Sequence, residues 1–276
     1  MKGGTMNVLL TGATGGIGAQ TAALLATRGA NLLLVARDAS RLKALRSRLT
    51  RFGTTVEVVA ADLATEEGRR RVAAAAHEFQ GGINVLINNA GINRFDLFDR
   101  QSDKDLEAVV NINLLAPMLL THKLLPLLQR QRMAVVLNVG SIVGSIGLPG
   151  QVAYCSSKFG MHGFSEALRR ELDGSPIRVV YVAPRSTDTD MNDSLLREIN
   201  ELTGVRTDDT SVVARHVVDA ITGARNERFI GWPERLFVKI NALLPGLVDR
   251  SLKKQRRLLN GSRMTDETHA ISNGVK

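Results

Sequence analysis

The chain has 276 residues, 44% of them hydrophobic, and a formal net charge of +9. This length can bury a large core and suits one large α/β domain or two small ones, of which we expect one. No run of about 18 apolar residues is present, so we expect a cytoplasmic protein without a spanning helix or signal peptide. The single cysteine, Cys155, excludes an internal disulfide, and the five histidines lack zinc-site spacing, so we expect no metal.

Short apolar runs alternate with longer amphipathic ones along the chain, which predicts a parallel sheet with crossover helices. The runs are almost continuously apolar, as expected for strands covered by helices on both faces. We therefore predict an α/β fold with a doubly wound parallel sheet of about seven strands. The predicted strands are residues 6–10, 31–36, 55–60, 84–87, 134–139, 177–182 and 228–230.

Two long helices are predicted in the middle of the chain. They span residues 103–130 and 153–173. The first contains Pro117 and Pro126, so we expect it to kink or end early.

A glycine-rich turn follows the first strand. It reads TGATGGIG from Thr11 to Gly18 and opens a helix near Gly16. Glycines there allow a tight turn and a close approach of backbone to a pyrophosphate, which the helix N-terminus attracts. The alternative, a flexible hairpin with a C-cap glycine, fits the strand-turn-helix context less well. The turn indicates a dinucleotide site in a single Rossmann-type domain.

The end of the second strand carries a cation where an acidic residue would favour NAD. Ala36 is neutral and Arg37 offers a planar fork suited to the 2′-phosphate, so NADP(H) is preferred over NAD(H). In the alternative interpretation, Arg37 is a solvated surface residue and Asp38 caps the next helix.

Two further strand ends contribute to this site. Asp62 and Leu63 close the third strand and would bracket the adenine, although Asp62 also suits a helix N-cap. The fourth strand runs into NNAG, residues 88–91, where small residues admit the cofactor and two amides can pin loops.

A tyrosine and a lysine four residues apart form the candidate catalytic pair. Tyr154 and Lys158 lie one helical turn apart on the same face, where an ammonium group would lower the pKa of the phenol. Ser141, on the loop after the fifth strand, could donate a hydrogen bond to the same substrate oxygen. Taken singly, these residues also suit a half-buried aromatic with a neighbouring lysine and a turn-forming serine.

From about Met6 to Thr189 the chain resembles the short-chain dehydrogenase/reductase family. The resemblance rests on TGATGGIG, Asp62-Leu63, NNAG, NINL, NVGSIVG and YCSSK, in that order. It implies that Ser141 polarises the carbonyl, Tyr154 is the acid/base, Lys158 lowers the pKa of Tyr154 and holds the nicotinamide ribose, and Asn113 supports a water-linked proton relay. The cofactor contacts that we expect are Gly12, Thr14, Gly16, Ile17, Gly18, Arg37, Asp62, Leu63, Asn89, Ala90, Gly91, Tyr154, Lys158, Pro184 and Thr189.

The chain departs from the family pattern in two places. Pro184-Arg185 replaces the usual Pro-Gly after the sixth strand, so the backbone there is altered or Arg185 contacts phosphate or an acidic substrate. Gly15 stands where NADP-dependent members carry a basic residue, which leaves Arg37 to hold the 2′-phosphate nearly alone.

We divide the chain into three parts. Residues 1–231 form the catalytic domain with a substrate lid at about 185–206, residues 232–260 form a basic amphipathic extension, and residues 261–276 form a disordered tail. From Trp232 to Leu258 there are seven basic residues and two acidic ones, a net of +5, and Pro245 interrupts the helical pattern. The apolar stripe either packs on the protein or lies in an anionic membrane interface, and we favour packing.

These features predict an NADP(H)-dependent oxidoreductase acting on a hydrophobic ketone, aldehyde or acyl substrate. The enzymatic alternative is a 3-oxoacyl-thioester reductase working on an acyl carrier, and the alternative of another class is a non-catalytic NADP(H)-binding sensor or scaffold. We expect a homodimer or homotetramer, no nucleic-acid partner, and a cytoplasmic location that includes the inner face of a membrane if the extension is interfacial.

Overall fold

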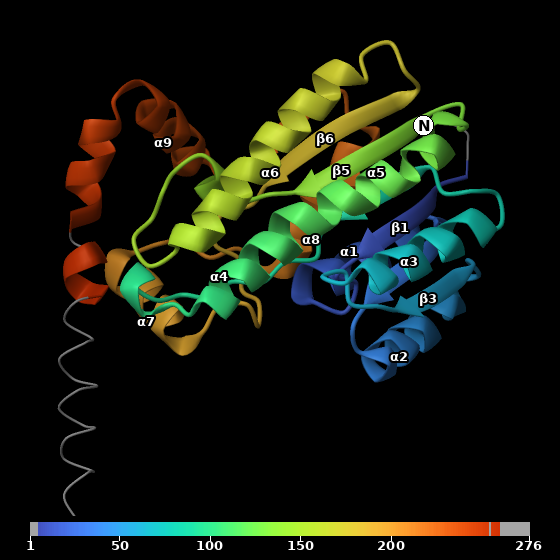
Figure 1. Ribbon diagram of the computed structural model, residues 1–276, viewed down its shortest axis with the longest axis horizontal. Coiled ribbons are helices and arrows are strands. Elements are labelled where there is room, and N and C mark those ends of the chain that lie inside the picture. The colour runs from blue at the N-terminus through green and yellow to red at the C-terminus, as the bar shows by residue number, and fades with distance from the viewer. Residues whose placement is uncertain (1–4, 254, 260–276) are drawn as a thin grey trace, which may run out of the picture.

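Seven parallel strands form the centre of the computed structural model, which describes residues 5–253 and 255–259. Their order across the sheet is β3-β2-β1-β4-β5-β6-β7 (Figure 1). This order confirms the predicted doubly wound sheet. The strands are β1 (Asn7–Thr11), β2 (Asn31–Ala36), β3 (Val56–Ala60), β4 (Val85–Asn88), β5 (Ala134–Val139), β6 (Ile177–Ala183) and β7 (Glu227–Phe229).

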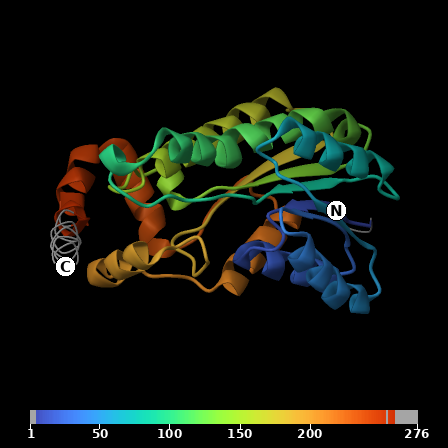
Figure 2. The same ribbon diagram turned by 60° about the horizontal axis from the view of Figure 1, so that its bottom comes forward.

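Helices cover both faces of the sheet, as Figure 2 shows with the sheet nearly edge-on. One layer consists of α1 (Gly16–Thr27), α2 (Ala39–Leu49) and α8 (Thr210–Thr222). The other consists of α3 (Glu66–Glu78), α4 (Asp103–Val110), α5 (Ala116–Gln129) and α6 (Val152–Glu171). Outside these layers lie α7 (Ser194–Thr203), α9 (Trp232–Leu243) and the short turns η1 (Thr50–Phe52), η2 (Phe98–Arg100), η3 (Asn111–Leu115) and η4 (Ile142–Gly144).

The pleat of the strands divides the hydrophobic core into two halves. Val8 and Leu10 of β1 pack against the layer of α1 and α8, whereas Leu9 between them packs against the layer of α3 and α5. All three side chains are fully buried. Strands sandwiched in this way must be apolar at successive positions, which is why the sequence shows runs rather than alternation.

The strand order places the functional site. The chain moves outward from β1 to β3, crosses back to β4 on the other side of β1, and continues outward to β7. The carboxyl ends of β1 and β4 therefore lie at the point where the order reverses. In doubly wound sheets a ligand crevice forms at this point.

The helix predicted at residues 103–130 is interrupted at a different place from the one expected. A π-helical turn, η3, separates α4 from α5, Pro117 lies in the first turn of α5, and α5 continues past Pro126 to Gln129. Early termination at Pro126 was therefore wrong. Among the described residues, Asp103–Gln129 is the one stretch long and apolar enough to cross a membrane, with a mean hydropathy of 1.4. Its buried leucines belong to the domain core, as in a core helix of a globular domain.

The C-terminal extension folds back onto the domain. After α9, residue 244 is not helical, and residues 245–253 and 255–259 are helical, so Pro245 begins a new segment as its fixed backbone favours. Val248 is buried with Ile142 and Ile146 of the catalytic domain, and Val238 and Leu252 pack beside them. Packing thus accounts for one side of the extension. The tail predicted at residues 261–276 lies outside the described residues.

Leu34→Ala should test the tightness of the core. Leu34 lies in the middle of β2 with no exposed surface, so the substitution leaves a cavity and should cost about 2–5 kcal/mol of unfolding free energy. Urea unfolding followed by circular dichroism should show a lower midpoint with an unchanged slope. Leu243→Ala is the matched control, because Leu243 is 80% exposed and should change stability by less than about 0.5 kcal/mol. Equal effects of the two substitutions would contradict the core assignment.

Candidate functional site

A single cavity of about 880 Å³ lies at the carboxyl ends of the strands. It extends from the glycine turn after β1 to the loops after β5 and β6, with further wall from the C-terminal extension. Every expected cofactor residue lines it, and so do Ser141, Tyr154 and Lys158. Asn113 does not line it. The residues that line the cavity therefore come from segments far apart in sequence, from Gly12 to Gln255.

The turn between β1 and α1 is built for close contact with an anion. Gly12 has φ +64°, and a Cβ there would lie 2.8 Å from Ala90 Cα, while a Cβ on Gly18 would collide with the carbonyl oxygen of Gly12. The N-cap of α1 is Gly15, which has no side chain to bond the first free amides of the helix. Those amides and the helix dipole remain available to a phosphate, so the turn fits a dinucleotide.

Polar side chains fix this turn to the end of β4. Asn89 Nδ2 donates to the carbonyl oxygens of Thr11 and Gly12 at 3.0 and 3.2 Å, and Thr11 Oγ1 accepts from the amides of Asn89 and Ala90. Asn88 Nδ2 donates to Asn138 Oδ1 at 2.8 Å and so joins β4 to β5. The predicted role in pinning a loop is thus confirmed for Asn89, whereas Asn88 joins two strands.

Two arginines lie at the adenosine end of the cavity, where the sequence indicated one. Arg37 is exposed and lines the cavity, and Asp38 caps α2 by accepting from the amides of Ser40 and Arg41. The cap confirms that part of the alternative interpretation, and contact of Arg37 with a 2′-phosphate stays a prediction. Arg41 also lines the cavity, and its Nη2 donates to the Thr14 carbonyl oxygen at 2.9 Å. Its position in the first turn of α2 was the available sequence signal.

Asp62 and Leu63 line the same end of the cavity. Asp62 is not the N-cap of α3, a role that Thr65 takes; instead Asp62 Oδ1 accepts from the amide of Ala64 at 2.9 Å. This short turn holds Leu63 buried against the core.

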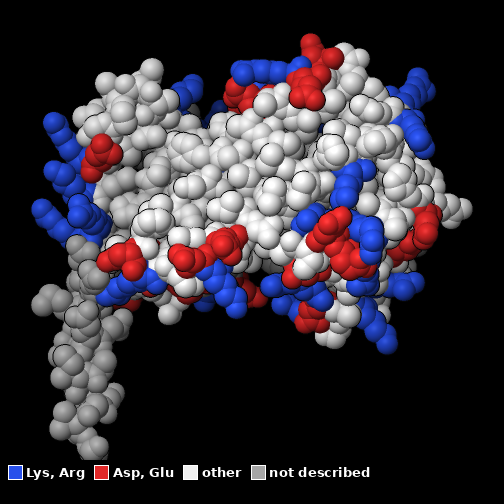
Figure 3. Space-filling model, in the orientation of Figure 1, with Lys and Arg blue, Asp and Glu red and all other residues white. Residues whose placement is uncertain are grey.

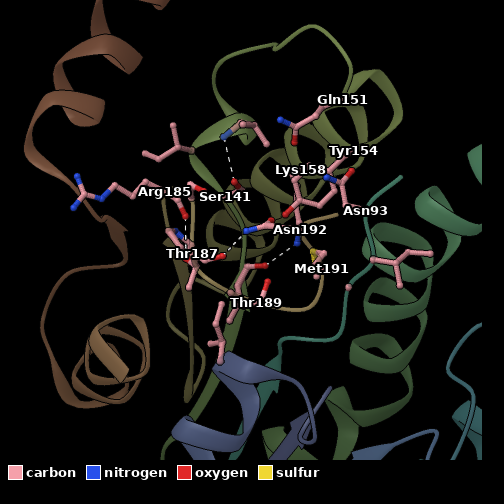
Figure 4. A pocket seen from close by; sticks show the side chains of 18 of the residues that line it. Asn93, Ser141, Gln151, Tyr154, Lys158, Arg185, Thr187, Thr189, Met191 and Asn192 are labelled. Carbon is pink, nitrogen blue, oxygen red and sulfur yellow. Dashed lines mark hydrogen bonds between the residues drawn. The ribbon is translucent and has the colours of Figure 1, made fainter. Parts of the chain in front are cut away.

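Ser141, Tyr154 and Lys158 converge in the centre of the cavity (Figure 4). Tyr154 and Lys158 lie on α6, and Lys158 Nζ is 5.6 Å from the centre of the Tyr154 ring. Lys158 Nζ donates to the Val139 carbonyl oxygen at 3.1 Å, which anchors the cation at the end of β5. The backbone of Ser141 begins η4, and its Oγ accepts from the amide of Val143.

Burial acts on the two titrating groups in opposite directions. Burial raises the pKa of Tyr154 to about 12, although a hydrogen bond with Ser141 pulls it down in part. Burial lowers the pKa of Lys158 to about 8. Both groups therefore resist becoming charged, and the lowering of the Tyr154 pKa by Lys158 stays a prediction for the enzyme with its ligands bound.

Asn113 supports the site from behind the cavity wall. It occupies the π-turn η3, its Oδ1 accepts from the amide of Ile92 at 2.8 Å, and its Nδ2 donates to the Ile92 carbonyl oxygen and to Ser157 Oγ. These bonds join the loop after β4 to α6. Asn111 instead donates to the Ala64 carbonyl oxygen. The bonds of Asn113 thus favour it over Asn111, and its part in a proton relay stays a prediction.

Tyr181 is a supporting residue that sequence reasoning missed. It is fully buried on β6, where its hydroxyl donates to the Ser141 carbonyl oxygen at 3.2 Å and accepts from the Ser141 amide at 3.4 Å. Its ring stacks on His162 with centres 4.6 Å apart. A tyrosine within the aliphatic run of residues 179–183 was the one available signal, because a buried hydroxyl needs a partner.

Arg185 is engaged by two carboxylates. Its Nη2 is 2.6 Å from Asp208 Oδ1 and its Nη1 is 3.3 Å from Glu234 Oε1. Figure 4 shows its guanidinium directed away from Tyr154 and Lys158. An arginine thus replaces the family's glycine without filling the centre of the site. Pro184 and Thr189 line the cavity on either side of it in sequence.

One cluster has the residue types of a metal site. Ligand atoms of His162, Glu166 and Glu227 lie within 4.8 Å of one another. Arg169 Nη1 is 2.7 Å from Glu227 Oε1, and Arg170 Nη2 is 2.7 Å from Glu166 Oε1. Guanidinium groups thus neutralise both carboxylates, and we assign no metal to this cluster.

Comparison with known proteins decides the family. The sequence model described as short chain dehydrogenase matches residues 6–200. The chain belongs to the short-chain dehydrogenase family. It is therefore an oxidoreductase that acts on CH–OH or C=O groups, and the match covers the glycine turn, Ser141, Tyr154 and Lys158.

This short-chain dehydrogenase is similar to several named proteins. It is 37% identical to nodulation protein G of Rhizobium sp. (strain N33), over 68% of this chain and 75% of that protein. It is 35% identical to the 3-oxoacyl-[acyl-carrier-protein] reductase FabG of Aquifex aeolicus, over 70% and 78% of the two chains.

Two solved structures share its fold. A short-chain dehydrogenase from Sphingobium yanoikuyae in complex with NADPH superposes with a TM-score of 0.76 and 29% identity, covering 88% of this chain and 95% of that one. A short-chain dehydrogenase from Burkholderia cenocepacia J2315 in complex with NADP superposes with a TM-score of 0.75 and 26% identity, covering 82% and 96%.

Lys158→Met should reveal the buried cation through the pH dependence of unfolding. Because the pKa of Lys158 is about 8 in the folded chain and near 10.5 in the unfolded chain, the unfolded state binds more protons between these values. The unfolding free energy of the parent protein should therefore rise, relative to the variant, as the pH increases from 8 to 10. Urea midpoints of the cofactor-free protein at pH 7, 8, 9 and 10 measure this difference.

The pH window ends near 10 because Tyr154 then acts in the opposite sense. Its folded pKa of about 12 exceeds the ordinary value of 10, so the unfolded chain loses the phenolic proton first and stability falls above pH 10. A difference between parent and Lys158→Met that stays constant from pH 7 to 10 would mean that Lys158 is not buried as a titrating group.

Proposed function

We propose that this protein is an NADP(H)-dependent reductase that interconverts a hydrophobic carbonyl compound and its alcohol. One observation carries the proposal: one cavity joins the glycine turn and two arginines at one end to Ser141, Tyr154 and Lys158 at its centre. NADPH, when bound, supplies the hydride. The protein supplies an anion-binding turn, a proton donor and a buried cation.

The polar residues suit proton transfer to a carbonyl oxygen. The Ser141 hydroxyl donates a hydrogen bond that polarises the carbonyl, and the Tyr154 phenol delivers the proton as negative charge develops on the oxygen. In the reverse direction Tyr154 accepts that proton. The Lys158 ammonium favours the phenolate and contributes to holding the nicotinamide ribose, while Asn113 supports the water-linked relay that would resupply the proton.

Two positive side chains support the preference for NADP(H). Arg37 and Arg41 line the adenosine end, and no acidic side chain occupies the end of β2 to repel a 2′-phosphate. The solved structures with NADPH and NADP support the same preference. Gly15 leaves the turn uncharged, so these two arginines would hold the phosphate together.

Apolar side chains contribute to the wall at the far end of the cavity, which favours a hydrophobic ketone, aldehyde or acyl substrate. Its lining includes Ile142, Ile146, Met191, Leu196, Phe237, Val248 and Leu252. A 3-oxoacyl thioester on an acyl carrier is the second candidate, supported by the FabG relatives and by the basic surface, which suits an acidic carrier. A non-catalytic sensor is disfavoured because Ser141, Tyr154 and Lys158 are all present.

We also place the protein in the cytoplasm as a homodimer or homotetramer, with the inner face of a membrane as a further location. Large apolar side chains are exposed along α4, η3, α5 and α6, which would be covered by a second subunit. They are Val110, Leu115, Met118, Val152 and Phe159.

NADPH oxidation against a panel of carbonyls tests the function. Long-chain ketones and aldehydes should be reduced faster than short soluble ones, and 3-oxoacyl thioesters of matched length separate the second candidate from the first. Tyr154→Phe should reduce kcat by about 100-fold or more, because the proton donor is lost, while NADPH affinity measured by fluorescence titration should change little. Full activity in this variant, or no turnover with any substrate by the parent protein, would contradict the proposal.

Arg37→Asp should shift the cofactor preference toward NADH. The change places a carboxylate beside the ribose and removes a cation, so KM for NADPH should rise by about tenfold or more, while KM for NADH should fall or stay constant. Arg41→Ala should also raise KM for NADPH. Arg48→Ala, an exposed change on α2 outside the cavity, is the control. An unchanged NADPH-to-NADH ratio in both cavity variants would show that the phosphate is held elsewhere.

A further inference from the structure

The outer side of the C-terminal extension exposes an unusual amount of apolar surface. Trp232 is 74% exposed and Leu243 is 80% exposed. Three more apolar side chains on this side are about half exposed: Leu236, Leu244 and Leu247. Single exposed leucines are ordinary, but a group of this size within sixteen consecutive positions is typical of a contact surface.

Cations lie beside this apolar surface. Exposed basic side chains in the described part of the extension are Arg235, Lys239, Arg250, Lys253, Arg256 and Arg257. Figure 3 shows blue side chains along the left edge, where Figure 1 places the helical segment that follows α9. Of the two acidic residues in this segment, Glu234 is paired with Arg185, which leaves Asp249 among the cations. The charge complements an anionic partner.

The inner side of the same extension forms part of the cavity. Phe237, Val248 and Leu252 line the substrate end of the cavity. Two polar contacts fix the extension there: Asn241 Nδ2 donates to the Ser145 carbonyl oxygen at 2.9 Å, and Glu234 pairs with Arg185 in the loop after β6. A ligand that binds the outer side therefore lies one helix thickness from the cavity.

We infer that the C-terminal extension docks on an anionic lipid surface and that substrate enters the cavity from that surface. Apolar side chains flanked by cations, with a tryptophan among them, match the region between lipid head groups and acyl chains. Anionic head groups pair with the basic row, which a second copy of this equally basic surface would repel. The proposal has two halves. The docking half, binding of the extension to lipid, stands on its own, and the entry half, entry of substrate from the lipid, rests on the proposed function.

The intrinsic fluorescence of the full-length protein tests the docking half, because Trp232 is the single tryptophan of the chain. Addition of phosphatidylcholine vesicles containing phosphatidylglycerol should shift its emission to shorter wavelength and sediment the protein with the lipid. Pure phosphatidylcholine vesicles should bind at least about tenfold less protein, because they lack the anionic head groups.

Matched variants locate the contact. The double substitution R256E and R257E should reduce binding by about tenfold or more, whereas R130E and R132E, an equal charge change outside the extension, should not. Leu243→Glu should weaken binding, whereas Met133→Glu, at a 52% exposed site on the loop before β5, should leave it intact. Far-ultraviolet circular dichroism and NADPH titration confirm that each variant is folded.

The entry half is tested with two ketones. A long-chain ketone that partitions into vesicles should be reduced faster as the phosphatidylglycerol fraction rises, and Leu243→Glu should abolish this increase, while a short soluble ketone should show no dependence on lipid. Lipid binding without any turnover would refute the proposed function and the entry half together, and would leave the docking half supported.

Three results would overturn the docking half. The first is an unchanged emission spectrum with anionic vesicles, and the second is equal binding to anionic and to pure phosphatidylcholine vesicles. The third is a spectral shift that appears without lipid, depends on protein concentration and accompanies a larger oligomer. The last result would assign the apolar surface to a second copy of the chain.

Discussion

The buried ammonium of Lys158 is the constraint on which the rest of the site depends. A cation at the end of a parallel sheet needs a partner that does not neutralise it, and the Val139 carbonyl oxygen provides one. The same burial keeps the neighbouring phenol protonated, with a pKa near 12. Near neutral pH the phenol is therefore uncharged, whereas Lys158, with a pKa of about 8, remains mostly an ammonium group, and the surrounding backbone keeps both in place.

That arrangement comes from supports that bond backbone rather than substrate. Asn113 fixes the loop after β4, Tyr181 fixes the loop after β5, and Asn89 fixes the glycine turn. A buried side chain that makes two or more hydrogen bonds to a loop restricts that loop more strongly than a single contact would. These backbone bonds thus decide where Ser141 and the glycine turn lie.

Much of the fold followed from local pattern. Apolar runs located every strand to within about a residue, because strands covered on both faces must be apolar throughout. Glycine spacing and the Tyr154–Lys158 pair located the candidate site, because both patterns are local in sequence. The bonds of Tyr181, the second arginine at position 41 and the π-turn around Asn113 were not predicted. Each depends on segments brought together by tertiary packing, which spacing along one chain does not specify.

The ion pairs of Arg185 make the loop after β6 and the C-terminal extension a single unit. A chain with glycine at this position would have no charge there to satisfy, so its tail could vary independently of the loop. Here a tail that lacks Glu234 would leave the Arg185 guanidinium paired with Asp208 alone. Replacement of Arg185 by glycine alone would leave Glu234 without its cationic partner. Exchange of C-terminal tails between this protein and its relatives should therefore require a matching change at position 185.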